Sequence, residues 1–433
     1  MPASPTAVPV GDWREPASVH AAICGNDPHS FWLDAGPDAV EGWSWVGTGI
    51  PETDPSRVRA VPLASRTPDE WAAGPFRGGW VGWVGYDEGA RRAGAPGSAS
   101  GSASEEETWL AVESFVAFDH SARRVWAIGP AEVATALAER VRAATAAPTV
   151  ADAPPTVATA RDTPDEYAVL IGRCREAIRR GDAYQLCLTT RFEIAGVVDP
   201  VAAFRRLRAR TPAHHGGVIR ADTVALVSAS PERFLEVRGA VVRTSPIKGT
   251  RPRSADPGED AALAAELRAS EKERAENIMI VDLMRNDLSR VCEPGSVAVD
   301  DLLVVESYPA VHQLVSTVSG TLRAGTTLGA LLEAGFPAGS MTGAPKLSAM
   351  TILHDLERGP RGVFAGCFGW VGHDGALDLA MVIRSIVIRP GGAYVGAGGG
   401  ITWRSDAAAE VAEVGVKARG PLAAVGADLP HGW

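Results

Sequence analysis

The chain has 433 residues, of which 45% are hydrophobic and 22% are charged, and its formal net charge is -10 at pH 7. This composition is typical of a globular protein, and the acidic balance argues against nucleic-acid binding, because no basic surplus is available to neutralise phosphates. No run of 18 apolar residues is present, and the N-terminus lacks a basic region followed by a hydrophobic one. We therefore expect a cytoplasmic protein with neither a membrane nor a nucleic-acid partner.

Five cysteines stand far apart along the chain and include no Cys-x-x-Cys pair. An odd number without such pairs predicts neither a disulfide framework nor a zinc site. We expect buried free thiols at Cys24, Cys174, Cys187, Cys292 and Cys367.

The first part of the chain alternates aromatic and small residues in short runs separated by glycine-rich turns. This pattern favours closely packed strands, which we expect over 30–34, 43–47, 78–86, 108–118 and 124–128. A run of Gly, Ala and Ser over 93–104 is expected to be a mobile loop. We expect an N-terminal β-rich subregion over 1–145, followed by a low-complexity connector over 146–162.

The clearest helix start lies at Thr163, which can act as the N-cap. Pro164 suits the first helical position, and Glu166 can complete a capping box. Apolar residues then recur on one helical face up to Gly181, which can end the helix, and a strand is expected over 184–192. The remaining chain mixes helices and strands without regular βαβ alternation, so we expect an α+β fold with mainly antiparallel sheets.

Two ionisable residues stand in stiff frames at predicted strand ends. Lys248 lies between Pro246 and Gly249, directly after an apolar run. Proline fixes its own backbone dihedral, and glycine permits a tight turn or a close approach to a ligand. Glu232 follows a proline at the end of the strand expected over 223–227. Each is either an ordinary turn residue or a functional group, the lysine as a nucleophile and the glutamate as a proton donor with a tuned pKa.

Two Glu-x-x-Glu pairs lie in segments with helical patterns. Positions three apart share a helical face, so each pair can direct two carboxylates at one point. Such oxygen ligands suit Mg2+, which takes one or two carboxylates from a protein and keeps several waters; the alternative is a solvated acidic face. The candidate ligands are Glu273, Glu276, Glu410 and Glu413. The second helix is largely apolar, so its carboxylates are expected to be buried and to need a cation.

Three further features are candidates for binding anionic groups. The run 396–401 is rich in glycine, and exposed backbone amides there can hold a carboxylate or phosphate. Arg384 is a charge within an apolar strand expected over 379–388, where arginine usually pairs with a carboxylate of the protein or of a ligand. Lys417 follows Glu413 by four residues, so it either pairs with that glutamate or reaches a substrate anion.

Taken together, these segments resemble the chorismate-utilising enzymes. The motifs that carry the resemblance lie at 230–232, 246–250, 282–288, 336–346 and 398–400 with the Glu pair that follows. The family includes component I of anthranilate synthase and of aminodeoxychorismate synthase, together with isochorismate and salicylate synthases. The resemblance implies a large two-lobed sandwich of antiparallel β-sheets and helices. It also implies a chorismate-binding catalytic region over 163–424, intertwined with the N-terminal part.

The resemblance implies a role for each candidate residue. The implied metal ligands are Glu276 and Glu413 directly, and Glu273 and Glu410 through water. The implied substrate-binding groups are Gly249, Thr250, Arg384, Lys417 and the amides of Gly398 and Gly400. Lys248 would attack C2 of chorismate while Glu232 protonates the departing C4 hydroxyl, and ammonia would then add at C4 and expel the lysine. A nearby cation and partial desolvation should lower the pKa of this lysine.

A few positions discriminate between branches of the family. Anthranilate synthases typically carry alanine where this chain has Lys248, whereas aminodeoxychorismate synthases carry lysine. Gln313 stands where many relatives have a histidine associated with pyruvate elimination, and His312 lies one place earlier. Gln185 occupies the place where the water-using branches carry a lysine base. The segment 211–215 departs from the family pattern Asn-Pro-x-Pro, which weakens the case for an inherited tryptophan site.

The sequence thus predicts a Mg2+-dependent enzyme of the aminodeoxychorismate synthase component I type, which makes 4-amino-4-deoxychorismate for 4-aminobenzoate synthesis. No Cys-His-Glu glutaminase signature is present, so ammonia must come from a partner glutamine amidotransferase or from free ammonium. One alternative is an anthranilate synthase component I, which makes anthranilate and pyruvate. Another, from a different class, is a non-catalytic regulatory subunit that binds chorismate or tryptophan.

Overall fold

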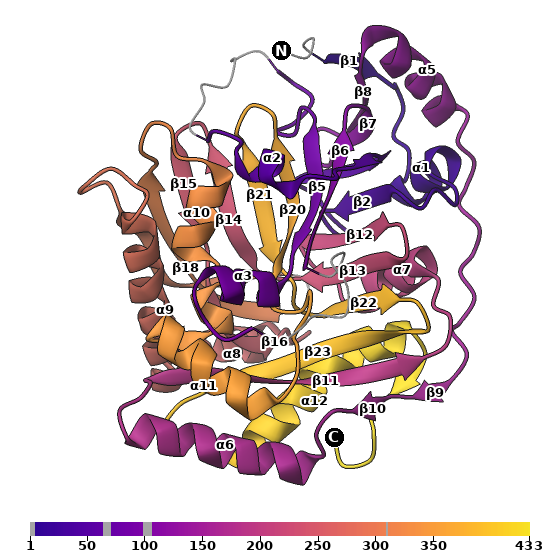
Figure 1. The fold of residues 1–433 in the computed structure, drawn as a ribbon. Coiled ribbons are helices and arrows are strands. Elements are labelled where there is room, and N and C mark those ends of the chain that lie inside the picture. Colours follow the sequence, from indigo (N-terminus) through magenta and orange to yellow (C-terminus); the bar gives the residue numbers. More distant parts are fainter. Residues whose placement is uncertain (1–4, 64–70, 98–105, 309–310) are drawn as a thin grey trace.

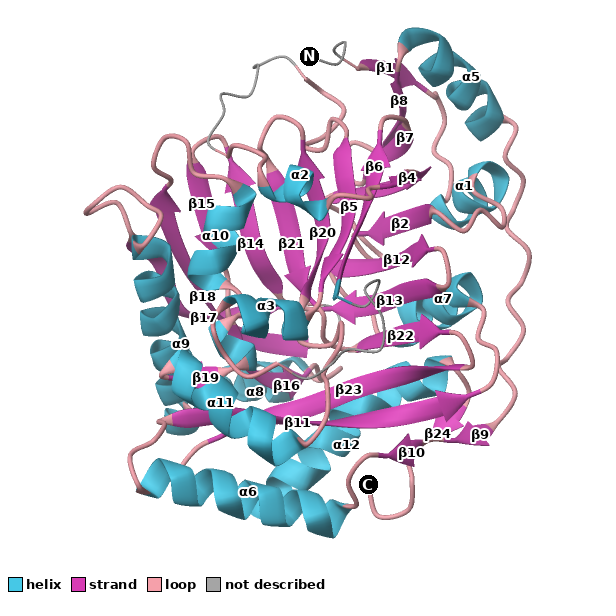
Figure 2. Ribbon diagram, viewed as in Figure 1, coloured by secondary structure: helices cyan, strands magenta, loops and turns pink. Residues whose placement is uncertain are grey.

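Two antiparallel sheets form the centre of the computed structural model, which describes residues 5–63, 71–97, 106–308 and 311–433 (Figure 2). The first, 12-stranded sheet has the order β1 (Thr6–Pro9), β8 (Arg124–Gly129), β7 (Phe115–Asp119), β3 (Trp43–Thr48), β2 (Ser30–Asp34), β12 (His215–Ala221), β13 (Val224–Ser230), β22 (Ser385–Arg389), β23 (Gly392–Ile401), β11 (Gln185–Ala195) and β10 (Thr159–Ala160), with β19 (Gly343–Ala344) beside β11.

The second, 10-stranded sheet, like the first, contains strands from both the N-terminal and the C-terminal parts of the chain. Its order is β16 (Ile247–Pro252), β18 (Val311–Thr321), β15 (Val241–Thr244), β14 (Arg233–Arg238), β21 (Leu377–Met381), β20 (Cys367–Gly372), β5 (Gly79–Val84), β6 (Glu107–Val112) and β4 (Ile50–Pro51), with β17 (Ala298–Ser307) beside β18. Each sheet therefore contains strands from before and after the 146–162 segment. That segment carries β9 (Thr156–Val157) and β10, and β9 pairs with β24 (Ala427–Asp428).

Helices cover the outer surfaces of the strands (Figure 1). They are α1 (Pro16–Ile23), α2 (Pro55–Arg59), α3 (Tyr86–Arg92), α5 (Ala131–Arg142), α6 (Pro164–Arg179), α7 (Pro200–Arg210), α8 (Pro257–Ala269), α9 (Glu271–Ser289), α10 (Leu328–Gly335), α11 (Lys346–Glu357) and α12 (Ala407–Ala424), with the short 3-10 helix η1 (Gly339–Met341). The capping box predicted at Thr163 is present, since its side chain accepts from the Glu166 amide and Glu166 accepts from the Thr163 amide. No helix in the described ranges is long and apolar enough to cross a membrane.

Alternation along the strands divides the apolar side chains between two cores. In β2, Phe31 and Leu33 join the core that also holds Trp83 and Trp370 of the second sheet. Trp32, between them in sequence, joins the other core, where α6, α7 and α12 pack on the first sheet. This is the period-2 pattern of a sheet buried on both faces. The predicted α+β fold with antiparallel sheets is confirmed, and all five cysteines are buried and free, as predicted.

Two strands predicted as continuous are each divided between the sheets. The run expected over 379–388 is β21 in the second sheet and β22 in the first, and the chain turns at Arg384, whose φ is +52°. The run expected over 108–118 is likewise β6 in the second sheet and β7 in the first. Apolar periodicity is the same in both sheets, so it does not mark the point where a strand changes sheet. Of the loop expected over 93–104, residues 98–104 lie outside the described residues.

Candidate active site

Lys248 lies where the two sheets meet. It belongs to β16, pairs in register with Leu314 of β18, and is followed by a register shift at Gly249. Gly249 has φ +77°, and a Cβ there would lie 2.7 Å from Leu267 and 2.9 Å from Glu273, so only glycine fits. The Lys248 ammonium lies 3.9 Å from Oε2 of Glu276 on α9. Thr250, the next candidate, is exposed.

The glycine-rich half of β23 faces Lys248 from the first sheet. A Cβ on Gly400 would lie 3.6 Å from the Lys248 ammonium and 2.2 Å from Nε2 of Gln185. Gly398 and Gly400 are half-buried, whereas Gly399 between them is buried. These glycines lie in a strand that is paired with β11 along its length. Pairing of β23 with β22 covers only 392–394, so the glycines extend past that neighbour.

The charge balance around Lys248 favours its protonated form. Burial alone would lower the pKa of Lys248, but the carboxylates of Glu276, Glu232 and Glu413 and the Cys187 thiol outweigh it. The net pKa is therefore raised, opposite to the predicted direction. Burial in turn raises the pKa of Glu276, against the charges of Lys248 and Lys272. The lysine and this carboxylate therefore form a coupled pair whose charge depends on what else enters the site.

Glu232 lies at the point where the chain passes from β13 to β14, and thus from the first sheet to the second. Its side chain is buried, and the Ser340 hydroxyl of η1 donates to its Oε1 at 3.1 Å. Burial raises the pKa of Glu232 to about 7, against the lowering effects of Lys248, Ser340 and Lys417. A carboxyl group with this pKa holds or releases a proton near neutral pH, as a general acid must.

The four candidate metal ligands lie on two helices, α9 and α12, and all four act on the ammonium of Lys272. On α9, Glu276 is buried, and its Oε1 has no hydrogen-bond partner among the described residues. On α12, Glu410 is buried beside Gly399, while Glu413 pairs with Lys417 at 2.6 Å. Glu273 lies beside Gly249. In the described ranges, no three His, Cys, Asp or Glu side chains already enclose a point that suits a metal ion.

Lys417 and Arg384, both candidates for binding anions, differ in whether they form an ion pair within the protein. Lys417 pairs with Glu413 and donates to the Gly398 carbonyl at 2.8 Å. Burial raises the pKa of Glu413, but the charge of Lys417 and its hydrogen bond outweigh that effect, so the net pKa lies below the usual value. Arg384 is half-buried, and no ion pair to it is found in the described part of the chain. Burial lowers the pKa of Arg384, and Glu413 opposes that effect.

Sequence reasoning missed two groups of this site. Ser340 gives no signal in the sequence, because its contact with Glu232 joins segments 108 residues apart. Lys272 lies on α9 between the predicted ligands, and its ammonium is 3.6 Å from Oε1 of Glu410. Its signal was available, since lysine occurs only four times in this sequence. Gln185 was noted for its family position, and both of its buried amide atoms have no partner among the described residues.

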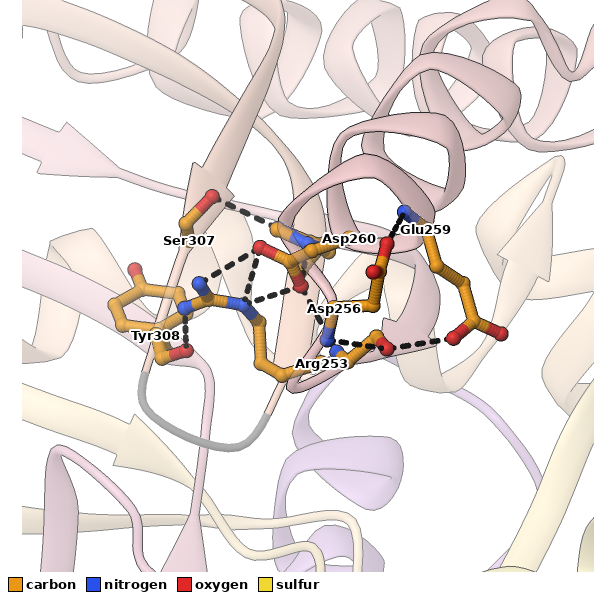
Figure 3. Close-up of polar contacts among 8 residues, drawn as sticks. Arg253, Asp256, Glu259, Asp260, Ser307 and Tyr308 are labelled. Carbon is orange, nitrogen blue, oxygen red and sulfur yellow. Dashed lines mark hydrogen bonds and ion pairs between the residues drawn. The ribbon is translucent and has the colours of Figure 1, made fainter.

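His312 belongs to a polar network at the start of α8, several members of which are labelled in Figure 3. Its Nε2 lies 3.0 Å from Oδ1 of Asp260, and its Nδ1 lies 2.8 Å from the Ser307 hydroxyl. Arg253 donates to Asp260 at 2.8 Å and to the Tyr308 carbonyl at 2.7 Å, which ties the start of α8 to the end of β17. Gln313, its neighbour, pairs in register with Thr250 instead. Both ring nitrogens of His312 are therefore engaged in this network.

A cavity of about 660 Å³ lies between the sheets, apart from Lys248 and Glu232. Its lining includes His214 and His215 from the segment 211–215, together with Asp34 and Trp370. Two residues of the segment that departs from the family's tryptophan-site pattern thus line this cavity.

Comparison with known proteins identifies the family. The family model described as chorismate binding enzyme matches residues 43–423. The chain is 39% identical over 368 residues to an aminodeoxychorismate synthase of Streptomyces pristinaespiralis, covering 81% of this chain and 51% of that protein. It is 37% identical over 446 residues to an anthranilate synthase component 1 of Streptomyces coelicolor, covering 96% of this chain and 87% of that protein. The chain spans about half the length of the first relative.

A solved structure agrees with these sequence matches. The crystal structure of anthranilate synthase component I from Streptococcus pneumoniae superposes with a TM-score of 0.74 at 29% identity, covering 97% of this chain and 92% of that one. The extent of the family match, together with the shared fold, leaves one assignment. This chain belongs to the family of chorismate binding enzymes.

Proposed function

We propose that this protein is an aminodeoxychorismate synthase component I, which converts chorismate and ammonia to 4-amino-4-deoxychorismate. The observation that carries the proposal is the position of Lys248, with its ammonium 3.9 Å from Glu276 and next to Gly400 at the junction of the two sheets. The anthranilate branch of the family typically has alanine in that place. A lysine at this point favours covalent catalysis, which divides one difficult displacement into two easier steps.

In this mechanism Lys248 and Glu232 act on opposite ends of the reacting system. Lys248 must first lose the proton that the surrounding carboxylates favour. The neutral amine then forms a bond to C2 of chorismate, the ring double bonds shift, and the C4 hydroxyl leaves as water with a proton from Glu232. Ammonia then forms a bond to C4, and the C2–N bond breaks to release the lysine. A Glu232 pKa of about 7 supports the role of proton donor.

Arg384 and the strand glycines are proposed to position the substrate anions. The Arg384 guanidinium is free of protein carboxylates within the described residues, and the half-buried Gly398 and Gly400 leave room against β23. Gln185 stands where the water-using branches have a lysine base, and glutamine is not a base. Its unpartnered amide can hydrogen-bond a ligand. The absence of a base at position 185 supports amination over hydroxylation.

The four glutamates fit a hydrated Mg2+ ion. They supply hard carboxylate oxygens, and the buried, unpartnered Oε1 of Glu276 needs a cation or a donor. We propose Glu276 and Glu413 as direct ligands, with Glu273 and Glu410 acting through water. When bound, the metal would supply a positive charge for the ring carboxylate of chorismate.

The ammonia source and the compartment belong to the same proposal. The chain has no glutaminase signature, so we propose a glutamine amidotransferase as partner, with free ammonium as a substitute in vitro. Five unpaired, buried thiols support a reducing compartment such as the cytoplasm. The 4-aminobenzoate route would consume the product.

Product analysis tests the proposal. The purified protein is incubated with chorismate, Mg2+ and ammonium, with and without an aminodeoxychorismate lyase, beside the Lys248→Ala variant. We expect 4-aminobenzoate only when the lyase is present, and loss of most activity in Lys248→Ala.

Two other outcomes point elsewhere. Anthranilate and pyruvate formed without the lyase would assign the protein to the anthranilate branch instead. No turnover with ammonium and Mg2+ would favour a non-catalytic subunit that binds chorismate or tryptophan.

A further inference from the structure

Lysine is rare in this protein and gathers at one place. The sequence has four lysines against 38 arginines. Three of them, Lys248, Lys272 and Lys417, contact the glutamates of α9 and α12, and the fourth, Lys346, is paired with Asp287. Apart from Lys346, the basic side chains elsewhere are arginines and histidines, and one arginine, Arg251, also lies 3.9 Å from Oε1 of Glu273 in the cluster. The ammonium group is therefore concentrated at the acidic cluster, where its compact shape and flexible stem differ most from a guanidinium.

Lys272 has a different relation to this cluster from the other two lysines. Its ammonium lies 3.6 Å from Oε1 of Glu410, which is the ion pair found for that buried carboxylate in the described residues. The Lys272 side chain is 49% exposed, whereas that of Glu410 is 4% exposed. The half-exposed Lys272 side chain thus lies between solvent and the buried Glu410 carboxylate.

All four glutamates act on this one ammonium. Burial would lower the pKa of Lys272, but the carboxylates of Glu410, Glu276, Glu413 and Glu273 outweigh it and raise the pKa. These are the four groups proposed to hold the divalent cation. Lys272 therefore occupies the same electrostatic field that a cation would enter, and two positive charges there repel each other.

We propose that Lys272 is the built-in counter-cation of Glu410 in the four-glutamate cluster and must move out into solvent before a divalent cation binds. The inference rests on the metal site of the proposed function and names a residue that sets its affinity. In the metal-free protein, Lys272 offsets repulsion among the carboxylates and holds Glu410 in place. When the metal enters, the half-exposed side chain can swing away at little cost, because it is not enclosed by other groups.

The resulting competition lowers the affinity for the metal. Removing Lys272 should strengthen metal binding about two- to fivefold, the range expected for loss of one partly exposed charge interaction. The same change should destabilise the metal-free protein, since Glu410 and Glu276 would then stand buried without that cation. A residue that merely supports the helix would not produce these opposite effects.

Metal binding to the full chain without substrate tests the proposal. Mn2+ affinity is measured by electron paramagnetic resonance, with Mg2+ as competitor, for wild type, Lys272→Met, Lys272→Arg and Glu276→Gln. Arg274→Met is the matched control, because Arg274 is an exposed residue of the same helix that donates to the Arg268 carbonyl and loses the same charge. We expect tighter binding in Lys272→Met, no gain in Lys272→Arg or Arg274→Met, and weak or no binding in Glu276→Gln.

A second readout observes the lysine directly. Protein labelled with 13C at the lysine ε position should give four side-chain signals, and the one missing in Lys272→Arg identifies Lys272. We expect Mg2+ to move that signal towards the value of a solvent-exposed lysine. A Lys272 signal unchanged by saturating Mg2+ would contradict displacement.

The outcomes separate the two proposals. If Glu276→Gln loses metal binding but Lys272→Met binds the metal as wild type does, or more weakly, the metal site stands and the role of Lys272 is overturned. A Lys272→Met variant whose only change is a higher KM for chorismate would make Lys272 a substrate contact and would also overturn it. If wild type binds no Mn2+, the metal site of the proposed function fails, and this inference fails with it.

Discussion

Glu232 and Arg384 lie at the two breaks where one antiparallel strand pair passes from the first sheet to the second. The amide of Met381 donates to the Glu232 carbonyl at 3.0 Å, and the amide of Ala229 donates to the Arg384 carbonyl at 3.2 Å. The two chains thus cross together, with backbone hydrogen bonds on both sides of the break. The crossing therefore brings the Glu232 carboxyl group and the Arg384 guanidinium into neighbouring positions of the two chain segments.

Glu232→Gln should change both stability and activity with pH. The pKa of Glu232 is raised from 4.5 to about 7, so its stabilising contribution is complete below pH 4.5 and is lost as pH rises through 7. Glutamine stays neutral, so the variant should gain stability over wild type across this window, reaching about 3 kcal/mol above pH 7. Urea unfolding at pH 5 and pH 8.5 measures the gain, and chorismate turnover should be almost lost.

The control for this prediction is Glu139→Gln on the exposed face of α5, which should show no gain that grows with pH. A stability difference for Glu232→Gln that is equal at both pH values would contradict the raised pKa.

Arg384→Ala should weaken chorismate binding without unfolding the protein. The side chain has no ion pair in the described residues, so its loss leaves no protein carboxylate unpartnered. We expect KM for chorismate to rise about tenfold or more, as for loss of a charge-assisted hydrogen bond, with a smaller change in kcat. Steady-state kinetics test this beside Arg389→Ala, which removes the same charge from the far end of β22 at the ion pair with Glu193. Equal KM values in both variants would exclude a direct contact with the substrate.

Gly400→Ala should reduce turnover more than stability. The added Cβ would lie 2.2 Å from Nε2 of Gln185, so the flexible amide must move, and 3.6 Å from the Lys248 ammonium. We expect turnover to fall about tenfold or more, because displacement of a group beside the nucleophile disturbs its alignment. Gly172→Ala is the control: Gly172 is exposed in α6 with nothing near its Cβ position, and alanine there should add about 0.5–1 kcal/mol of stability. A Gly400→Ala variant with normal turnover would show that Gln185 can relax without effect.

Arg361→Met should be among the most destabilising single changes. Arg361 and Glu357 are buried and joined at 2.7 Å, and Glu357 also accepts from the amide and hydroxyl of Thr189 in β11. Removing the arginine leaves a buried carboxylate without its cation, which costs about 3–5 kcal/mol. Denaturant unfolding tests this against Arg358→Met, whose exposed arginine lies 3.7 Å from Asp162 and should contribute about 1 kcal/mol or less. A cost below 1 kcal/mol for Arg361→Met would mean that another group neutralises Glu357.

Local signals in the sequence were sufficient for the elements and for the identity of most candidate residues. The capping box at Thr163 and the strand predicted over 30–34 depend on neighbours in the chain, and the structure has both. The helical spacing of the Glu-x-x-Glu pairs also held, since both lie on helices. Lys248 was singled out because Pro246 and Gly249 constrain it, and the positive φ of Gly249 agrees with that reasoning.

Features that depend on distant contacts were not predictable in the same way. The division of 379–388 between two sheets leaves no mark in the apolar pattern, because each half is buried in its own sheet. The contact of Ser340 with Glu232 and the position of Lys272 over Glu410 each join segments more than 100 residues apart. The raised pKa of Lys248 follows from carboxylates on three different elements, which only the folded chain brings together.

The interleaving of early and late strands has a consequence for the protein cut in two. Cleavage within 146–162 would give an N-terminal piece holding β2 and β5 and a C-terminal piece holding their partners β12 and β20. Each piece would expose open strand edges from both sheets, so neither should fold alone. When the two pieces are mixed, they should reassemble by fragment complementation and recover the activity that each piece lacks.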